Sequence, residues 1–204
     1  LKIFNTERLQ CQQIKMAGIS LCYPDVRKHL DNQSGCVIIG FQKMRFFFGS
    51  EETKIKERLL ASAKALRQPP SAVAQKFSAM RDALAARGNQ TMSARTDLEK
   101  LIGKGNRSMA EDNNRNFARF MESLFFDYQP DVLVETVLWV FRTYRAHGFQ
   151  TTYWAANLNV WVDMIKKEFS PEEFAALYPF YHWLIVHIPV FTQLTDSDLA
   201  TKNP

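Results

Sequence analysis

Histidines are the side chains in this sequence best suited to ligate a metal or a haem iron, because imidazole nitrogens bind transition metals readily. Three of the four lie in the C-terminal half of the chain: His147, His182 and His187. His182 and His187 are five residues apart, so on a helix they point about 140° away from each other and are poorly placed to hold one ion. Each histidine is therefore expected to pack and hydrogen-bond, and no metal site is predicted.

Nucleophilic and acid–base chemistry has little support in the residue pattern. The chain lacks the Gly-x-Ser-x-Gly turn of a serine nucleophile, and its three cysteines lie before residue 40 with no Cys-x-x-Cys spacing. The acidic pairs all stand where helices are expected to begin: Glu51-Glu52, Glu111-Asp112 and Glu172-Glu173. Negative charge is stabilised there by the helix dipole without any catalytic role. We therefore predict that the protein is not an enzyme.

From about residue 54 onward, the spacing of apolar residues predicts a series of helices. The expected helices are 54–68, 71–88, 97–102, 111–124, 131–145, 154–165 and 170–188. Gly88-Asn89 is expected to cap the second of these, and Pro179 to kink the last. The clearest signal is Ser170-Pro171-Glu172-Glu173, which predicts a capping box with proline at the first helical position. The densest core is expected from Asn116 onward.

Residues 1–50 differ from the rest of the chain. They hold every cysteine, lack sustained helical periodicity, and contain two short apolar runs, 35–41 and 45–49, that are typical of strands. We predict an N-terminal appendage of uncertain order over 1–50 and one helical domain over 54–195.

Composition narrows the class of protein. A chain of 204 residues with 46% hydrophobic content is long enough for one domain with a sizeable core. No apolar run approaches the length of a membrane span and no secretory signal is apparent, so a soluble, cytoplasmic protein is expected. The net charge of +5 comes from basic residues spread over helical faces, without a nucleic-acid-binding motif, so nucleic-acid binding is not expected.

A family resemblance enters at residues 140–149 (VFRTYRAHGF), followed by Tyr153 and the helix that carries Leu158, Trp161 and Ile165. This passage resembles the junction between the sixth and seventh helices of bacterial globins, where a haem-binding histidine precedes a glycine by four residues. The resemblance covers residues 109–190, and the closing aromatic helix is similar to the last globin helix. It implies an all-α, globin-like bundle of about six to seven helices.

The chain departs from the globin pattern at the haem ligand. Tyr144 occupies the slot four residues before Gly148, and histidine appears only at His147. Globin-fold domains without haem serve as bacterial sensory or signalling modules, and the resemblance implies such a role here. The tentative ligand pocket consists of Tyr144, His147, Trp161 and Tyr181, and it would take a small apolar ligand, unless the domain docks a protein partner instead.

Two alternatives remain open from the sequence. In the first, the protein is a haem globin that binds or senses a diatomic gas, with His147 or Tyr144 on the iron and Arg115 or Arg119 facing the distal side. Tyrosine does ligate haem iron in catalases. In the second, the aromatic side chains are simply core, and the chain is a structural module that forms a homodimer through its last helix.

Overall fold

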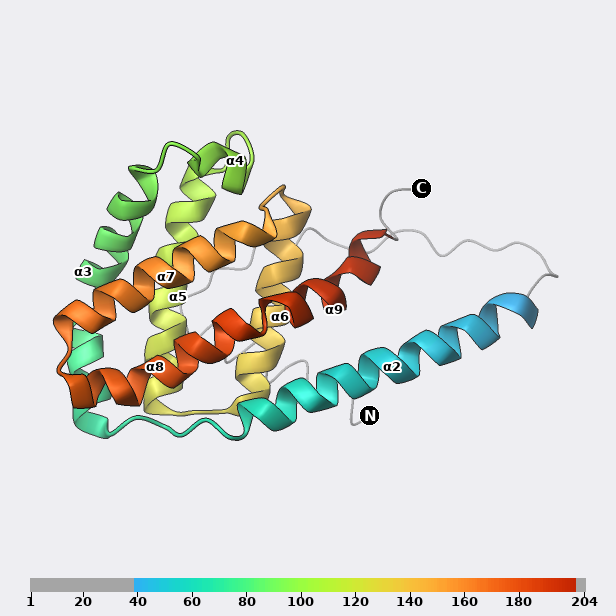
Figure 1. Ribbon diagram of the computed structural model, residues 1–204, viewed down its shortest axis with the longest axis horizontal. Helices are drawn as coiled ribbons and strands as arrows, with labels where there is room; N and C mark the ends of the chain where they lie inside the picture. The colour runs from blue at the N-terminus through green and yellow to red at the C-terminus, as the bar shows by residue number, and fades with distance from the viewer. Residues whose placement is uncertain (1–38, 201–204) are drawn as a thin grey trace, which may run out of the picture.

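The computed structural model of this chain describes the backbone of residues 39–200 and the side chains of residues 51–196. Within these residues every regular element is a helix (Figure 1). In chain order the helices are α2 (Ile39–Ala63), α3 (Ser71–Ser93), α4 (Leu98–Ile102), α5 (Arg107–Phe126), α6 (Pro130–Ala146), α7 (Thr151–Glu168), α8 (Pro171–Val186) and α9 (Ile188–Ala200). The predicted all-α class is therefore confirmed for the described part of the chain.

The helix boundaries of α6 and α8 follow the signals in the sequence. Pro130 and Pro171 lie in the first turns of α6 and α8, where the missing N–H costs no helical hydrogen bond. Ser170 Oγ accepts from the Glu173 N–H at 3.2 Å, and the Glu173 carboxylate accepts from the Ser170 N–H at 2.8 Å. The predicted capping box is thus confirmed. After α6, Gly148 has a φ of +94°, the left-handed conformation that ends many helices.

The strand predicted at residues 45–49 is wrong, because α2 begins at Ile39 and continues unbroken to Ala63. A short apolar run does not distinguish a strand from a helix by periodicity alone, and here the helical pattern that follows extends back through it. The expected boundary between appendage and domain, near residues 50–54, therefore falls inside one helix. The other predicted strand, 35–41, is wrong over residues 39–41, which also lie in α2. Residues 1–38 lie outside the described residues.

Gly88 and Asn89 do not end α3, which continues to Ser93. Gly88 is buried, and a Cβ at this position would meet Met164 Cε at 3.3 Å and Asn114 Nδ2 at 3.8 Å. The glycine therefore lets α3 approach α5 and α7 closely, which sequence alone cannot distinguish from a helix cap. Asn89 Oδ1 accepts from Asn114 Nδ2 at 2.8 Å, which ties α3 to α5.

The last predicted helix, 170–188, corresponds to α8, which ends at Val186, and a further helix, α9, begins at Ile188. The axes of α8 and α9 differ by 43° across this break, while α8 continues through Pro179. Pro189 follows the break by two residues, and the missing N–H of proline disfavours an uninterrupted helix there. The sequence analysis did not predict α9, and this missed element raises the number of helices to eight in the described residues, above the six to seven expected.

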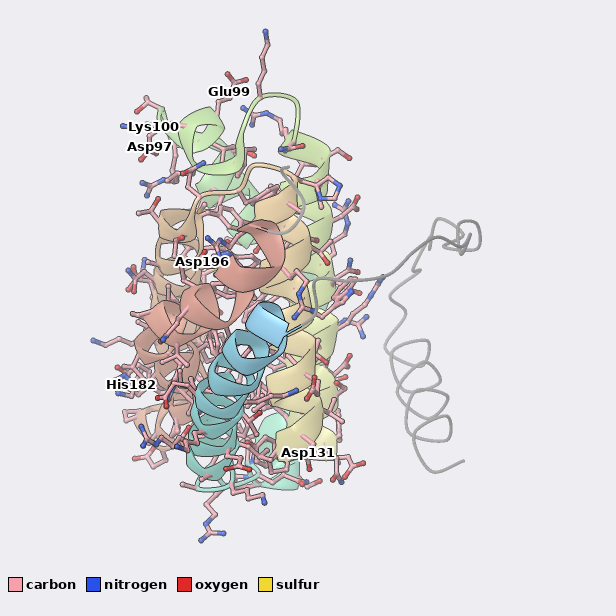
Figure 2. All side chains as sticks on the ribbon, turned by 90° about the vertical axis from the view of Figure 1, so that its right-hand side faces the viewer. Asp97, Glu99, Lys100, Asp131, His182 and Asp196 are labelled. Carbon is pink, nitrogen blue, oxygen red and sulfur yellow. The ribbon has the colours of Figure 1, made fainter. Side chains whose placement is uncertain are left out.

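The helices pack as two connected groups. α3 packs on α5 and α7, and α7 packs on α8, whereas α6 packs on α2 and α9. In Figure 1, α7 and the α8–α9 pair cross in front of α5 and α6. Figure 2, turned by 90°, shows α2 beside α9 and places Asp131, at the start of α6, at the opposite end of the molecule from Glu99 of α4.

The core is densest in the C-terminal half, as predicted. Most of the largest fully buried side chains lie after Asn116, among them Trp161, Tyr153, Tyr181 and Phe180. The predicted α7 stripe is buried throughout. Among the described residues no single helix is long and apolar enough to cross a membrane; α8 and α9 reach that length and composition only together, across their bend.

Candidate functional site

A cavity of about 80 Å³ lies where α5, α6 and α7 face one another, with one side chain each from α8 and α9 closing it. Its walls are mainly apolar, and the largest contributions come from aromatic and aliphatic side chains: Phe117, Phe120, Phe141, Trp154, Leu158 and Phe191. These positions belong to the buried faces of amphipathic helices, which is why the sequence places apolar residues there.

The cavity opens between α5 and α6. Four of its lining residues are partly exposed, and they come in two pairs: Asn116 and Phe117 on α5, and Trp139 and Val140 on α6. The lining residues from α7, α8 and α9 are all buried. Neither α5 nor α6 has the other as its main packing partner, since α5 packs on α3 and α6 on α2 and α9. A ligand would therefore enter between these two helices and meet α7 at the far side.

Stacked aromatic rings form the floor of the cavity. The Phe141 ring lies 4.5 Å from the Trp154 ring at an interplanar angle of 22°, and 5.0 Å from the Phe191 ring. Tyr144 meets Trp154 edge-on at 5.7 Å. Aromatic pairs of this kind keep their rings in fixed positions, so the cavity has a defined apolar surface made by α6, α7 and α9.

Two buried polar atoms of the lining residues have no hydrogen-bond partner among the described residues: Trp154 Nε1 and Asn157 Oδ1. Trp154 is 6% exposed and Asn157 is 2% exposed, so water reaches neither side chain freely. A buried polar group without a partner costs about 1–3 kcal/mol. Unpaired buried groups of this kind are uncommon in folded proteins. Both atoms lie beneath the cavity surface, because almost none of either atom is accessible to solvent.

Tyr144, the first of the predicted pocket residues, does line the cavity. Burial, with a smaller contribution from the charge of Asp112, raises the pKa of Tyr144 to about 12. Its side chain is therefore a neutral phenol at physiological pH, able to donate or accept a hydrogen bond but not to act as a base.

His147 does not line the cavity. It is exposed at the C-terminal end of α6, where its Nδ1–H donates to the Thr143 carbonyl at 2.8 Å. The backbone leaves the helix at His147, so the residue does not continue the face that carries Tyr144. On a regular helix, residues three apart such as Tyr144 and His147 would lie on one side, but here Tyr144 lines the cavity and His147 does not.

Trp161 and Tyr181 lie behind the cavity wall, in the core. The Trp161 indole N–H donates to Asn114 Oδ1 at 3.0 Å, and neither ring is exposed. Both rings contact Phe117 edge-on, at 5.3 and 6.0 Å, and Phe117 lines the cavity. These two predicted pocket residues thus support the wall without facing the ligand site.

The geometry around the cavity does not fit a haem group. A cavity of about 80 Å³ lies well below the roughly 300–1,000 Å³ of pockets that hold drug-sized ligands. The exposed His147 is directed to the backbone of its own helix, and the pKa of Tyr144, raised to about 12, disfavours the phenolate that would bind iron. Arg115 and Arg119 border a separate polar hollow against α3, so neither faces a distal side.

The other two histidines of the described residues, His182 and His187, each have a polar neighbour. The His187 Nδ1–H donates to the Trp183 carbonyl at 2.8 Å, and its Nε2 lies 3.4 Å from Ser62 Oγ. His182 is exposed on α8 (Figure 2), with Nδ1 at 3.3 Å from the Tyr178 hydroxyl. Across residues 51–196, no three histidine, cysteine or acidic side chains come together as a metal site would require.

Sequence reasoning did not assign Trp154 and Asn157 to the pocket, although both residues line the cavity. One signal was present: Asn157 is an asparagine on the buried face of α7, beside Leu158 and one turn from Trp154. A polar residue on such a face needs a partner or a ligand. The predicted pocket was instead chosen around the position that corresponds to the haem ligand of globins.

Comparisons with known proteins returned no match for this chain, whether with protein families, with curated proteins or with solved structures.

Proposed function

We propose that this chain is a haem-free, globin-like helical domain with a sensory or regulatory role, and that it binds a small apolar ligand between α5, α6 and α7. The observation that carries the proposal is the cavity of about 80 Å³, with its mainly apolar wall and its opening between α5 and α6. Cavities lined by apolar side chains bind small apolar molecules, as the engineered cavity of about 150 Å³ that takes benzene or xenon illustrates.

The size and chemistry of the cavity favour a small ligand over a cofactor. At roughly half the volume of that benzene-binding cavity, it accommodates a gas atom or a few non-hydrogen atoms, with more room toward the opening. The one ionisable lining side chain, Tyr144, stays neutral because its pKa is raised to about 12. A wall without a general base or a nucleophile supports binding rather than catalysis.

Ligand binding is better supported than docking of a protein partner. Among the described side chains, only Phe126 and Val186 are large hydrophobic residues with high exposure, at 46% and 49%. Single exposed apolar residues are normal on a monomer, whereas docking surfaces are contiguous patches of several hundred Å². Dimerisation through α8 and α9 therefore remains the secondary proposal, and its test is the dependence of size on concentration by light scattering.

Filling the cavity tests the ligand-binding proposal directly. Val137 lines the cavity on α6, so Val137→Phe is expected to occupy it, abolish xenon binding measured by ¹²⁹Xe NMR, and change stability by less than about 1 kcal/mol. The matched control is Val134→Phe on the same helix, at a buried position away from the cavity.

The control should behave in the opposite way. Val134→Phe has no space to enter, so overpacking is expected to cost about 1–3 kcal/mol of unfolding free energy by urea denaturation, while xenon binding persists. If wild-type protein shows no xenon binding, or if Val137→Phe binds xenon as the wild type does, the proposed site is wrong.

A further inference from the structure

We propose that the polar hollow between α3 and α5 is a second ligand site, which binds a free amino acid through side chains of opposite charge on α5. The carboxylate of the amino acid pairs with Arg115 and Arg119, and its ammonium group pairs with Glu111. The hollow shares no lining residue with the apolar cavity, so this inference goes beyond the proposed function and does not depend on it.

The hollow lies in the groove where α3 and α5 pack on each other. Two alanines of α3, Ala85 and Ala86, border it, and their methyl groups are too short to fill the space toward the arginines of α5. At one end, Asn89 Nδ2 of α3 donates to the Glu111 carbonyl at 3.2 Å and holds the helices together. The volume of about 530 Å³ lies within the roughly 300–1,000 Å³ of pockets that bind small molecules.

Three charged side chains of α5 border the hollow at a regular spacing. Glu111, Arg115 and Arg119 follow one another at intervals of four residues, so successive side chains are neighbours on the helix surface, about 6 Å apart along its axis. Their order places one carboxylate at one end of the hollow and two guanidinium groups toward the other. Two guanidinium groups one turn apart can bind a single carboxylate, because arginine presents several N–H donors in a fixed plane.

The acidic and basic side chains of the hollow do not neutralise one another. A glutamate four residues before an arginine is well placed to form an ion pair on a helix, yet neither Glu111 nor Arg119 forms one among the described residues. Both of these side chains belong to partly buried residues, where an unpaired charge is more costly than in open water. A ligand that carries both signs removes that cost at both places.

Arg115 has a partner that a ligand can replace. It pairs with Asp112, which does not line the hollow. The two side chains are 48% and 56% exposed, and exposed ion pairs of this kind contribute little to stability. Arg115 is therefore available to the carboxylate of a ligand.

The other polar residues of the hollow fit the same assignment. Asp82 borders it, but both of its carboxylate oxygens accept from Arg81 at 2.9 Å. This hydrogen bonding is the main reason why the pKa of Asp82 is lowered, and the charge of Arg119 contributes least. Gln90 and Ser93 complete the lining on α3, and neither side chain forms a hydrogen bond among the described residues.

A ligand of one sign would leave part of this site unmatched. A simple anion would pair with the arginines but lie close to the Glu111 carboxylate, and a simple amine would lie close to two guanidinium groups. A free amino acid carries an ammonium group next to a carboxylate. It therefore meets both signs at once, in the order in which Glu111 and Arg115 present them.

The test begins with NMR titration of the full chain with each of the twenty L-amino acids. The amino acid that binds most tightly is then compared with two analogues that have the same side chain: the acid without the amino group and the amine without the carboxylate. Dissociation constants are measured for the wild type, Glu111→Gln and Arg119→Gln. Neither position is fully buried and glutamine is favourable in helices, so both variants are expected to fold.

The wild type is expected to bind each analogue at least about tenfold more weakly than the amino acid, because each lacks one charged hydrogen bond. Glu111→Gln should weaken amino acid binding by about tenfold and leave the acid unchanged or tighter, because a repelling charge is gone. Arg119→Gln should weaken the amino acid and the acid by about tenfold alike.

A larger side chain in the hollow gives a test that leaves every charge in place. Ala86→Leu is expected to occupy the space above α3 and weaken amino acid binding by more than about tenfold. The matched control is Ala83→Leu, at an exposed position of α3 that does not border the hollow. The control should bind the amino acid within about twofold of the wild type.

Three outcomes overturn the inference. It is wrong if no L-amino acid gives saturable shifts, if Glu111→Gln weakens the acid as strongly as the amino acid, or if Ala86→Leu binds the amino acid as the wild type does. Xenon binding in the apolar cavity is measured on the same samples, so a failure of this site is distinguished from a failure of the proposed function.

Discussion

Helix α7 carries two buried tryptophans, Trp154 and Trp161, that face the core two turns apart. Only the indole N–H of Trp161 has a hydrogen-bond partner among the described residues. The Trp161 indole donates to Asn114, which in turn donates to Asn89 of α3, so the hydrogen bonds link α7, α5 and α3. The Trp154 indole and its neighbour Asn157 each keep a buried atom without a partner, although both residues line the cavity. The first arrangement stabilises the fold, whereas each unpaired buried atom of the second costs stability.

The difference follows from helix packing. Near Trp161, α3 packs closely on α5 and α7 because Gly88 of α3 has no side chain. A Cβ at Gly88 would contact Met164 of α7 and Asn114 of α5. Around Trp154, α5 and α6 have other main partners, and the space between them is not filled. An indole N–H and an asparagine oxygen are therefore hydrogen-bonded near Trp161, whereas the same two groups are unpaired at Trp154 and Asn157.

The largest effect on stability is expected from Asn114, which lies in the hydrogen-bonded chain around Trp161. Asn114→Leu leaves the fully buried Trp161 N–H without an acceptor and breaks the bond to Asn89, so it should lower the free energy of unfolding by about 2–3 kcal/mol. Urea denaturation followed by tryptophan fluorescence measures this. A loss below about 1 kcal/mol would show that the network is not a main source of stability.

An intermediate effect is expected at the cavity from Tyr144. Its folded-state pKa of about 12 exceeds the value of about 10 for an unfolded chain, so the stability it contributes is complete below pH 10 and is lost as the pH rises toward 12. Over that range the wild type should lose up to roughly 2 kcal/mol more than Tyr144→Phe. Denaturation of both proteins at pH 9, 10 and 11 checks the sign, and equal slopes would contradict it.

The smallest effect on stability is expected from Asn157→Leu. The substitution removes a buried acceptor that has no partner and replaces it with an apolar group of similar size, which is neutral or stabilising by up to about 1 kcal/mol. The same chemical change thus has opposite signs at Asn114 and Asn157. A loss of more than about 1 kcal/mol at Asn157 would mean that this side chain is paired in solution, and the comparison between the two regions would no longer hold.

Much of the fold was predictable from local signals. Apolar spacing located the buried stripe of α7, and the capping box and prolines marked the starts of α6 and α8. Two failures share one cause: residues 45–49 and Gly88 lie inside helices. In both cases a residue type common at helix ends or in strands takes its role from surrounding packing, which local patterns do not contain. A third failure is α9, which follows the bend at His187 and was not predicted.

The candidate site was less predictable than the fold. Of the four pocket residues expected from sequence, Tyr144 lines the cavity, Trp161 and Tyr181 lie behind it, and His147 is exposed. Helix spacing predicts which residues share a face, but whether that face meets another helix or an open space depends on how distant helices pack. The resemblance to globins directed attention to the haem ligand position, away from the α7 wall.

The sequence by itself determined the helical class, most helix boundaries and the aromatic core of the C-terminal half, because periodicity, capping and proline act over a few residues. Only the tertiary structure decided which buried polar groups find partners. Trp154 and Trp161 are alike in type, helix and burial, and their indole N–H groups differ only in what α5 and α6 bring near them. The Trp161 bond depends on a residue 47 positions away in the chain, which no local pattern specifies.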